Sequence, residues 1–280
     1  MSGMNKIELA DGGGWVARHA AFGSRYVAAR HVDVWCPPGY GEAPNRRYAV
    51  IYMHDGQNLF EPAWAAYGID WGVDEALARL VRDAGLPGAI VVGIWNSPDR
   101  RRDYMPENPL RMPEAAAVRS AFAAETGGDS MADDYLRFLT QELKPFIDAT
   151  YQTLPDRRHT FVMGSSMGGL ISLYALVEYP DLFGGAGCLS THWPIGGDVL
   201  VDWFGAALPP PGNHRLYFDY GTATLDAGYE PFQRRMDAHL LAAGYQPGSD
   251  WLTMKFEGAE HNEPAWRARV DIPLAFLLRP

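Results

Sequence analysis

Residues 161 to 170 read Phe161-Val162-Met163-Gly164-Ser165-Ser166-Met167-Gly168-Gly169-Leu170. The segment begins as the end of an apolar strand, passes through a tight turn of small residues and continues into a helix. A serine at such a turn forms a nucleophile elbow, in which small neighbours let the backbone turn sharply. The Gly-x-Ser-x-Gly pattern predicts Ser166 as a nucleophile and Ser165 as a packing residue. A glycine-rich turn with incidental serines is the alternative.

Length and composition allow one large α/β domain or two small ones. The chain has 280 residues, 47% of them hydrophobic, which is enough to form a large buried core. Its formal net charge of −10 and pI near 5.2 argue against nucleic acid as a partner, because phosphate binding needs a clustered basic surface. The basic run Arg100-Arg101-Arg102 is short and lies between Asp99 and Asp103.

The two cysteines, Cys36 and Cys188, lie far apart in apolar segments, so we expect buried free thiols rather than a disulfide. They show no spacing typical of a metal site, and we expect neither a metal nor an organic cofactor. The N-terminus lacks a basic region followed by an apolar run, and no segment approaches eighteen apolar residues. We therefore expect a soluble, cytoplasmic protein with no membrane association. The sequence carries no signal for the oligomeric state.

Alternating strand and helix patterns predict a mostly parallel, doubly wound sheet with helices on both faces. Residues 31–36 alternate apolar and polar before Pro37-Pro38-Gly39, which indicates an antiparallel strand near a sheet edge. Further strands are expected at residues 48–53, 89–95, 185–189, 216–220 and 251–256, and further helices near 73–80, 133–151 and 231–243. We expect residues 1–280 to form a single domain.

Residues 96–134 interrupt this alternation. The segment contains several prolines, the arginine run and a weak alanine-rich helix at about 113–124. A connection of this length in a compact α/β domain is uncommon unless it acts as a lid or binding loop. We predict a lid or binding segment, and a surface excursion without a role is the alternative.

A serine hydroxyl needs a base to take its proton, and a carboxylate commonly orients that base. In hydrolases with a nucleophile elbow the chain order is serine, acid, histidine. Of the four histidines after Ser166, His261 lies five residues past the last expected strand, at the carboxyl edge of the sheet. His239 falls in an expected helix, and His214 precedes a strand. We predict His261 as the base, and His192 as a substrate contact or a plain loop residue.

The acid should follow the strand at 216–220. Asp226 has the position expected of an orienting carboxylate, although an N-cap of the next helix is its alternative role. Glu230 is the second candidate, and Asp219, expected inside the strand, is the third. We predict Asp226.

A developing oxyanion needs two backbone N–H donors. One is expected from Met167, the residue after the nucleophile, at the start of the elbow helix. The other should come from the run His54-Asp55-Gly56-Gln57, which directly follows an apolar strand. We predict the N–H of Gln57, since Gly56 lets the backbone turn inward.

The chain resembles the putative esterase family of α/β-hydrolases, which includes enterochelin, feruloyl and acetyl-xylan esterases and, more distantly, mycolyltransferases. The matching residues span nearly the whole chain: Arg30 to Tyr40, ending in Pro-Pro-Gly-Tyr; His54-Asp55-Gly56; Arg100-x-x-Asp103-Tyr104; Glu142 to Asp148; Gly164 to Gly169; Tyr179-Pro180-x-x-Phe183; and Gly258-x-x-His261. The resemblance implies an α/β-hydrolase fold, with Ser166 and His261 in catalytic roles. It also implies Met167 and Gln57 as oxyanion donors. Members of the family are often secreted.

Taken together, these features predict a serine esterase acting through an acyl-serine intermediate on a small-molecule ester with a small acyl, aromatic acyl, sugar or siderophore-type group. Trp193 and Trp95 lie near expected strand ends and are predicted to contact the substrate. Two alternatives remain: an acyltransferase with the same triad, and a catalytically silent binding module on the same fold.

Overall fold

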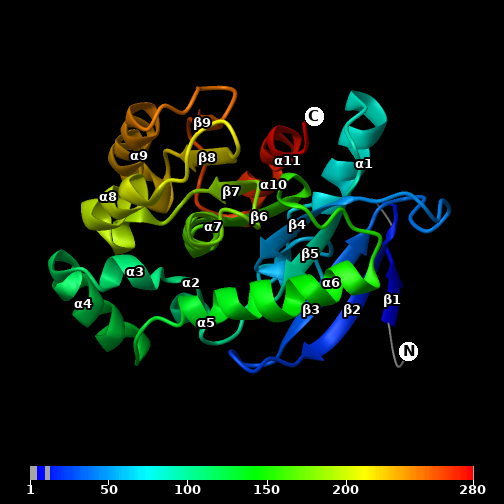
Figure 1. The fold of residues 1–280 in the computed structure, drawn as a ribbon, viewed down its shortest axis with the longest axis horizontal. Helices are drawn as coiled ribbons and strands as arrows, with labels where there is room; N and C mark the ends of the chain where they lie inside the picture. The colour runs from blue at the N-terminus through cyan, green and yellow to red at the C-terminus, as the bar shows by residue number, and fades with distance from the viewer. Residues whose placement is uncertain (1–4, 10–12, 280) are drawn as a thin grey trace.

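The computed structural model describes residues 5–9 and 13–279, which are built around a nine-stranded sheet (Figure 1). The strand order is β1-β2-β3-β5-β4-β6-β7-β8-β9. The strands are β1 (Asn5–Glu8), β2 (Trp15–Phe22), β3 (Arg30–Cys36), β4 (Ala49–His54), β5 (Ala89–Ile94), β6 (Thr160–Ser165), β7 (Gly185–Leu189), β8 (Arg215–Gly221) and β9 (Trp251–Phe256). The pairings β1–β2, β2–β3 and β3–β5 are antiparallel, and the other pairings are parallel.

Helices cover both faces of the sheet. They are α1 (Val73–Ala84), α2 (Arg100–Tyr104), α3 (Glu107–Leu110), α4 (Ala116–Thr126), α5 (Ala132–Arg137), α6 (Lys144–Thr150), α7 (Met167–Glu178), α8 (Gly197–Ala207), α9 (Glu230–Ala242), α10 (Glu263–Arg267) and α11 (Asp271–Leu278). In Figure 1, α1 and α11 lie on the far side of the sheet from the long α5–α6 helix. The sheet is thus the middle layer of three.

Alternation along each central strand produces two cores. In β4, Val50 and Tyr52 belong to a cluster that includes residues of α5 to α9. Ile51 and Met53 belong to a second cluster with residues of α1 and α11. Successive side chains of a strand point to opposite faces, so a strand between two helix layers must be apolar at every position. The apolar run at 48–53 predicted such a strand, and it is confirmed.

The expected helix at 133–151 is present but not regular. Between α5 and α6 lies a π-helical turn, η3 (Phe138–Leu143), and Pro145 stands in the first turn of α6. Proline lacks the N–H that a continuous α-helix would use, and a local change of helical register accommodates this. The predicted apolar stripe is buried at Tyr135, Leu139 and Ile147.

Sequence patterns did not predict β1, β2, α8, α10 or α11. β2 carries the polar residues Arg18 and His19, and its register with β3 shifts between His19 and Phe22. Such a strand lacks a clean period of two residues. The predicted free, buried thiols of Cys36 and Cys188 are confirmed. Among residues 5–9 and 13–279, no helix combines the length and apolar character needed to span a bilayer.

The segment at 96–134 lies at the same end of the sheet as the elbow. It folds into α2, α3, a short helical turn and α4, close to the expected alanine-rich helix. α2 packs against α7, the helix that follows the elbow, and α3 packs against α8. This position is the one a lid or binding segment requires, and that role stays a prediction.

Candidate active site

The strand-to-helix turn holds Ser166 in a strained conformation. Its φ is 57° and its ψ −121°, a combination that residues with a side chain rarely adopt. A Cβ atom on Gly164 would lie 2.9 Å from the backbone of Gly168, so this position requires glycine. The backbone carbonyl of Ser166 accepts N–H bonds from Gly169 and Leu170 at the start of α7. Ser166 is half-buried, which leaves part of it accessible at the sheet edge.

His261 and Asp226 come from separate loops at the carboxyl edge of the sheet. His261 Nδ1 lies 2.6 Å from Asp226 Oδ1. The N–H of His261 also donates to Thr224 Oγ1 at 2.9 Å, which joins the two loops a second time. Because the carboxylate accepts the proton at Nδ1, Nε2 of a neutral His261 is an acceptor. This is the tautomer that a general base for Ser166 requires.

Asp226 sits among further hydrogen-bond donors. Its Oδ2 accepts from Ser190 Oγ at 2.6 Å and from the N–H of Gly221 at 2.7 Å. Burial disfavours the Asp226 anion, but the hydrogen bonds from His261, Ser190 and Gly221 outweigh it and lower the pKa of Asp226. The carboxylate is therefore ionised at neutral pH.

Behind Ser190 lies a buried ion pair between Arg269 and Asp219. Arg269 Nη2 is 2.9 Å from Asp219 Oδ1 and also donates to Ser190 Oγ at 3.0 Å. Trp266 Nε1 donates to the same hydroxyl at 3.0 Å. Sequence reasoning missed Ser190 and Arg269. Ser190 directly follows a central strand at the carboxyl edge, a signal that could have found it, whereas no local pattern marks Arg269.

The other carboxylate candidates have other partners. Asp219 is occupied by Arg269, Ser190 N–H and Tyr217. Glu230 forms ion pairs with Arg234 and Lys255 at the surface. Neither is hydrogen-bonded to His261 in the part of the chain that the structure describes.

One predicted oxyanion donor lies in the elbow, and the other lies in the turn after β4, the strand beside the elbow strand β6. Met167 is the first residue of α7, and Gln57 lies in the short helical turn η1 (Gly56–Asn58) after β4, so both N–H groups lie in a first helical turn, where no helical acceptor is available. A Cβ on Gly56 would lie 2.3 Å from the backbone of Gly93, so η1 can pack this closely only with glycine there. The N–H of Asn96 donates to Gln57 Oε1 at 3.3 Å, which places the side chain.

Asp55, two residues before the predicted oxyanion donor Gln57, is held in a clamp by the 96–134 segment. Arg100 contacts both oxygens of Asp55, at 2.6 and 2.7 Å, and Asn96 Nδ2 donates to Oδ1 at 2.7 Å. Burial disfavours the Asp55 anion, but Arg100 and Asn96 outweigh it and lower the pKa of Asp55. The backbone of Asp55 has a φ of 57°, so the clamp holds a strained turn in place.

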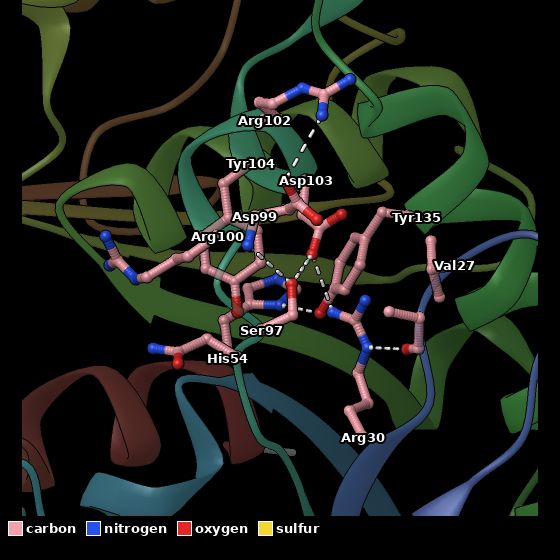
Figure 2. A network of polar contacts seen from close by, with 12 residues as sticks. Val27, Arg30, His54, Ser97, Asp99, Arg100, Arg102, Asp103, Tyr104 and Tyr135 are labelled. Atoms are coloured by element: carbon pink, nitrogen blue, oxygen red, sulfur yellow. Dashed lines mark hydrogen bonds and ion pairs between the residues drawn. The ribbon is translucent and has the colours of Figure 1, made fainter. Parts of the chain in front are cut away.

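Figure 2 shows a second network beside this clamp. Arg30 of β3 pairs with Asp103 of α2 at 3.0 Å, and Ser97 Oγ donates to Asp103 at 2.9 Å. His54 Nδ1 lies 2.8 Å from the hydroxyl of Tyr135. The networks thus fix α2 to β3, and α5 to the end of β4, so α2 and the Asp55 turn are held as one unit.

The two tryptophans predicted to contact substrate differ. Trp193 is 1% exposed, its Nε1 donates to Gln233 at 3.0 Å, and its ring packs against Phe204. This corrects the expectation for Trp193: the turn after β7 directs the ring into the core. Trp95 is half-buried and donates to Asp33 at 2.8 Å, and its role in binding stays a prediction.

Comparisons with known proteins identify the family. The sequence model of the putative esterase family matches residues 24–271. The ferri-bacillibactin esterase BesA of Bacillus subtilis is 33% identical over 159 residues, which cover 54% of this chain and 50% of BesA. The match thus spans about half the length of that curated relative.

Solved structures with the same fold include an enterobactin esterase from Shigella flexneri, with a TM-score of 0.68, 19% identity and coverage of 95% of this chain and 59% of that one. A ferulic acid esterase gives a TM-score of 0.66 at 18% identity, covering 94% of this chain and 98% of that chain. Because the sequence identities are below 25%, these structural similarities show the fold alone. The chain belongs to the putative esterase family, and it is an enzyme of the ester-hydrolysing class with the α/β-hydrolase fold.

Proposed function

We propose that the protein is a serine carboxylic ester hydrolase that works through an acyl-serine intermediate. Ser166 is the nucleophile, His261 the general base and Asp226 the carboxylate that orients the base. The observation that carries the proposal is the 2.6 Å contact between Asp226 Oδ1 and His261 Nδ1, at the sheet edge that also presents the strained Ser166. Membership of the putative esterase family supports it.

The geometry supports the following steps. Ser166 Oγ attacks the ester carbonyl carbon while His261 Nε2 takes the hydroxyl proton. The tetrahedral intermediate collapses, the bond to the alcohol oxygen breaks, and His261 returns the proton to that oxygen. Water then repeats the sequence on the acyl-serine and releases the acid. Asp226 stays ionised throughout and stabilises the imidazolium.

The N–H groups of Met167 and Gln57 are the proposed donors to the oxyanion. Backbone donors fixed before the reaction stabilise the developing charge without reorganisation, and each such donor contributes roughly 10²–10³-fold to kcat. The Arg100–Asp55 clamp supports this role because it holds the turn that precedes Gln57.

For the substrate we propose an ester of the siderophore or feruloyl type, since BesA is named for ferri-bacillibactin and the structural neighbours are named for enterobactin and ferulic acid. Sugar esters and small acyl esters are the other classes that the sequence predicts. A screen of p-nitrophenyl, feruloyl, acetyl-sugar and siderophore esters separates these classes. Product analysis with added alcohols separates hydrolysis from acyl transfer.

The test of the mechanism is Ser166→Ala against Ser165→Ala. We expect Ser166→Ala to lose on the order of 10³-fold or more in kcat and to lose labelling by a fluorophosphonate probe, because the triad acts as a unit. Ser165→Ala is the matched control and should retain both. Normal turnover in Ser166→Ala, with an inactive Ser165→Ala, would contradict the assignment of the nucleophile.

A further inference from the structure

A second histidine, His192, lies beside the elbow on the side opposite the Gln57 turn. It follows β7, which pairs with one edge of β6, whereas the Gln57 turn follows β4, which pairs with the other edge. The N–H of His192 donates to the backbone carbonyl of Ser166 at 3.2 Å. The ring centres of His192 and His261 are 6.4 Å apart. His192 is therefore at the reaction site, but the proposed mechanism does not use it.

One ring nitrogen of His192 is already occupied. Nδ1 lies 2.5 Å from the hydroxyl of Tyr229, whose side chain is 1% exposed and has no other hydrogen bond among the described residues. A buried hydroxyl that has a single partner satisfies its one proton by donating it. Tyr229 therefore donates to Nδ1, and the proton of the neutral ring is at Nε2.

The other nitrogen, Nε2, faces no protein partner in the described part of the chain. It makes no hydrogen bond there, and it is not among the buried side-chain atoms that lack one. Since the side chain is only half-buried, Nε2 is accessible to a bound molecule. The ring thus offers an accessible N–H donor on a residue whose backbone contacts Ser166.

The charge state of His192 suits a neutral donor. Burial lowers the pKa of His192 to about 4, with further contributions from the charges of His261, Arg101 and Arg100, while Asp226 opposes the shift. Above about pH 5 the ring is therefore uncharged. With Nδ1 held by Tyr229, the ring cannot replace His261 as the base for Ser166.

We propose that His192 is a substrate-binding residue whose Nε2–H donates a hydrogen bond to an oxygen atom of the ester substrate next to the scissile bond. The inference rests on the proposed function. It assigns a substrate class: esters that carry a hydroxyl, carbonyl or phenolic oxygen two or three bonds from the reacting ester group. The oxygen belongs on the side of Ser166 away from the Gln57 turn.

Two variants separate the donor from the ring. In His192→Gln the amide nitrogen can take the place of Nε2, whereas in His192→Asn the shorter side chain reaches only the place of Nδ1. Two isosteric pairs of esters serve as probes: methyl lactate against methyl isobutyrate places the extra oxygen on the acyl half, and glycol monoacetate against propyl acetate places it on the alcohol half.

We expect the wild type to prefer the hydroxy ester of at least one pair. His192→Asn should lose that preference by roughly 10-fold in kcat/KM, the value of one hydrogen bond to a ligand, mainly through KM. His192→Gln should retain a large part of it. The ratio of kcat/KM for the hydroxy ester between wild type and His192→Asn should stay constant from pH 6 to 9, since the donor does not titrate there.

Three results would overturn the inference. The first is a wild type with no preference in either pair, and the second is a His192→Asn variant that keeps the preference. The third is an equal loss on both members of a pair, which would indicate a purely structural role. Absence of turnover with every ester, together with absence of fluorophosphonate labelling, would instead contradict the proposed function.

Discussion

At the scale of single residues, the hydrogen bonds of Ser190 fix the direction in which its hydroxyl proton points. Its Oγ receives N–H bonds from Trp266 and Arg269, both at 3.0 Å, which occupy its two acceptor positions. Its one proton must then point to Asp226 Oδ2, 2.6 Å away. Ser190 and Arg269 are therefore positioning residues for the carboxylate rather than catalytic residues.

Replacing Ser190 by alanine removes one donor from Asp226. The Ser190 hydrogen bond helps to lower the pKa of Asp226, so its loss raises that pKa, and we expect the acid limb of the pH–rate profile to move to higher pH. We also expect kcat to fall by about 10-fold, because one charge-assisted hydrogen bond is lost. The control is Ser172→Ala, which removes a buried hydroxyl bonded to the Gly168 carbonyl. It should affect stability alone, and an equal shift of the profile in both variants would contradict the prediction.

The identity of the acid is tested by Asp226→Asn. We expect kcat to fall by up to roughly 10⁴-fold, because an amide at this position favours the wrong tautomer of His261. Glu230→Gln is the control, since Glu230 pairs with Arg234 and Lys255 instead. Steady-state kinetics of both variants decide the matter: a larger loss in Glu230→Gln would transfer the role to Glu230.

At the scale of elements, the contacts of α2 explain the motif Arg100-x-x-Asp103-Tyr104, to which sequence analysis assigned no role. Arg100 clamps Asp55, Asp103 pairs with Arg30, and the hydroxyl of Tyr104 accepts the N–H of Asp55 at 3.4 Å. All three contacts tie the start of the 96–134 segment to the ends of the strands. The motif is therefore a structural support for the Gln57 turn.

The clamp predicts a loss of both stability and activity in Arg100→Met. The buried charge of Asp55 would lose its ion-pair partner. Breaking a buried ion pair in this way lowers the free energy of unfolding by about 3–5 kcal/mol. Turnover should fall by roughly 10-fold or more, since the turn before Gln57 loses its support. Arg101→Met is the neighbouring control, because Arg101 pairs with Glu125 at the surface. Thermal unfolding and kinetics that do not distinguish the two variants would contradict the clamp.

Local signals explain which elements the sequence predicts. Three segments of the site were predictable because each follows a strand directly and consists of small or polar residues: the elbow, the turn after β4 and the His261 loop. A short stretch of sequence is enough to recognise each of them. The hydrogen bond between Asp226 and His261 joins residues 35 positions apart, yet it was predictable because strand order and chain order together place both loops at one edge.

At the scale of the whole molecule, the partners of buried charges could not be predicted. Arg269 and Asp219 are 50 positions apart, and Arg30 and Asp103 are 73 apart. Each pair is brought together only by the packed sheet, and no period or motif records it. Packing also decides the position of Trp193. Its place after a strand predicts a substrate contact, but the turn after β7 places its ring in the core.

Asp74 in the first turn of α1 makes the stability of the whole chain depend on pH. It is 2% exposed, and its Oδ1 has no hydrogen-bond partner among the described residues. Burial raises the pKa of Asp74 from 3.8 to about 7, and the nearby carboxylates Glu75 and Asp70 act in the same direction. A carboxyl whose pKa is raised by folding favours the folded state most when it is protonated. Its contribution is therefore full below about pH 4, and it is lost as the pH rises to about 7.

The variant Asp74→Asn removes this ionisation. An amide keeps one oxygen for the backbone N–H groups of Asp74 and Glu75 and carries no charge at any pH. We expect a gain on the order of 2–4 kcal/mol at pH 8, equivalent to a rise in Tm of several degrees, and a clearly smaller gain at pH 5. Asp83→Asn, at the exposed end of the same helix, is the control and should change Tm little at either pH. Thermal unfolding at the two pH values is the measurement. An equal gain at pH 5 and pH 8 would show that packing, and not the ionisation of Asp74, is responsible.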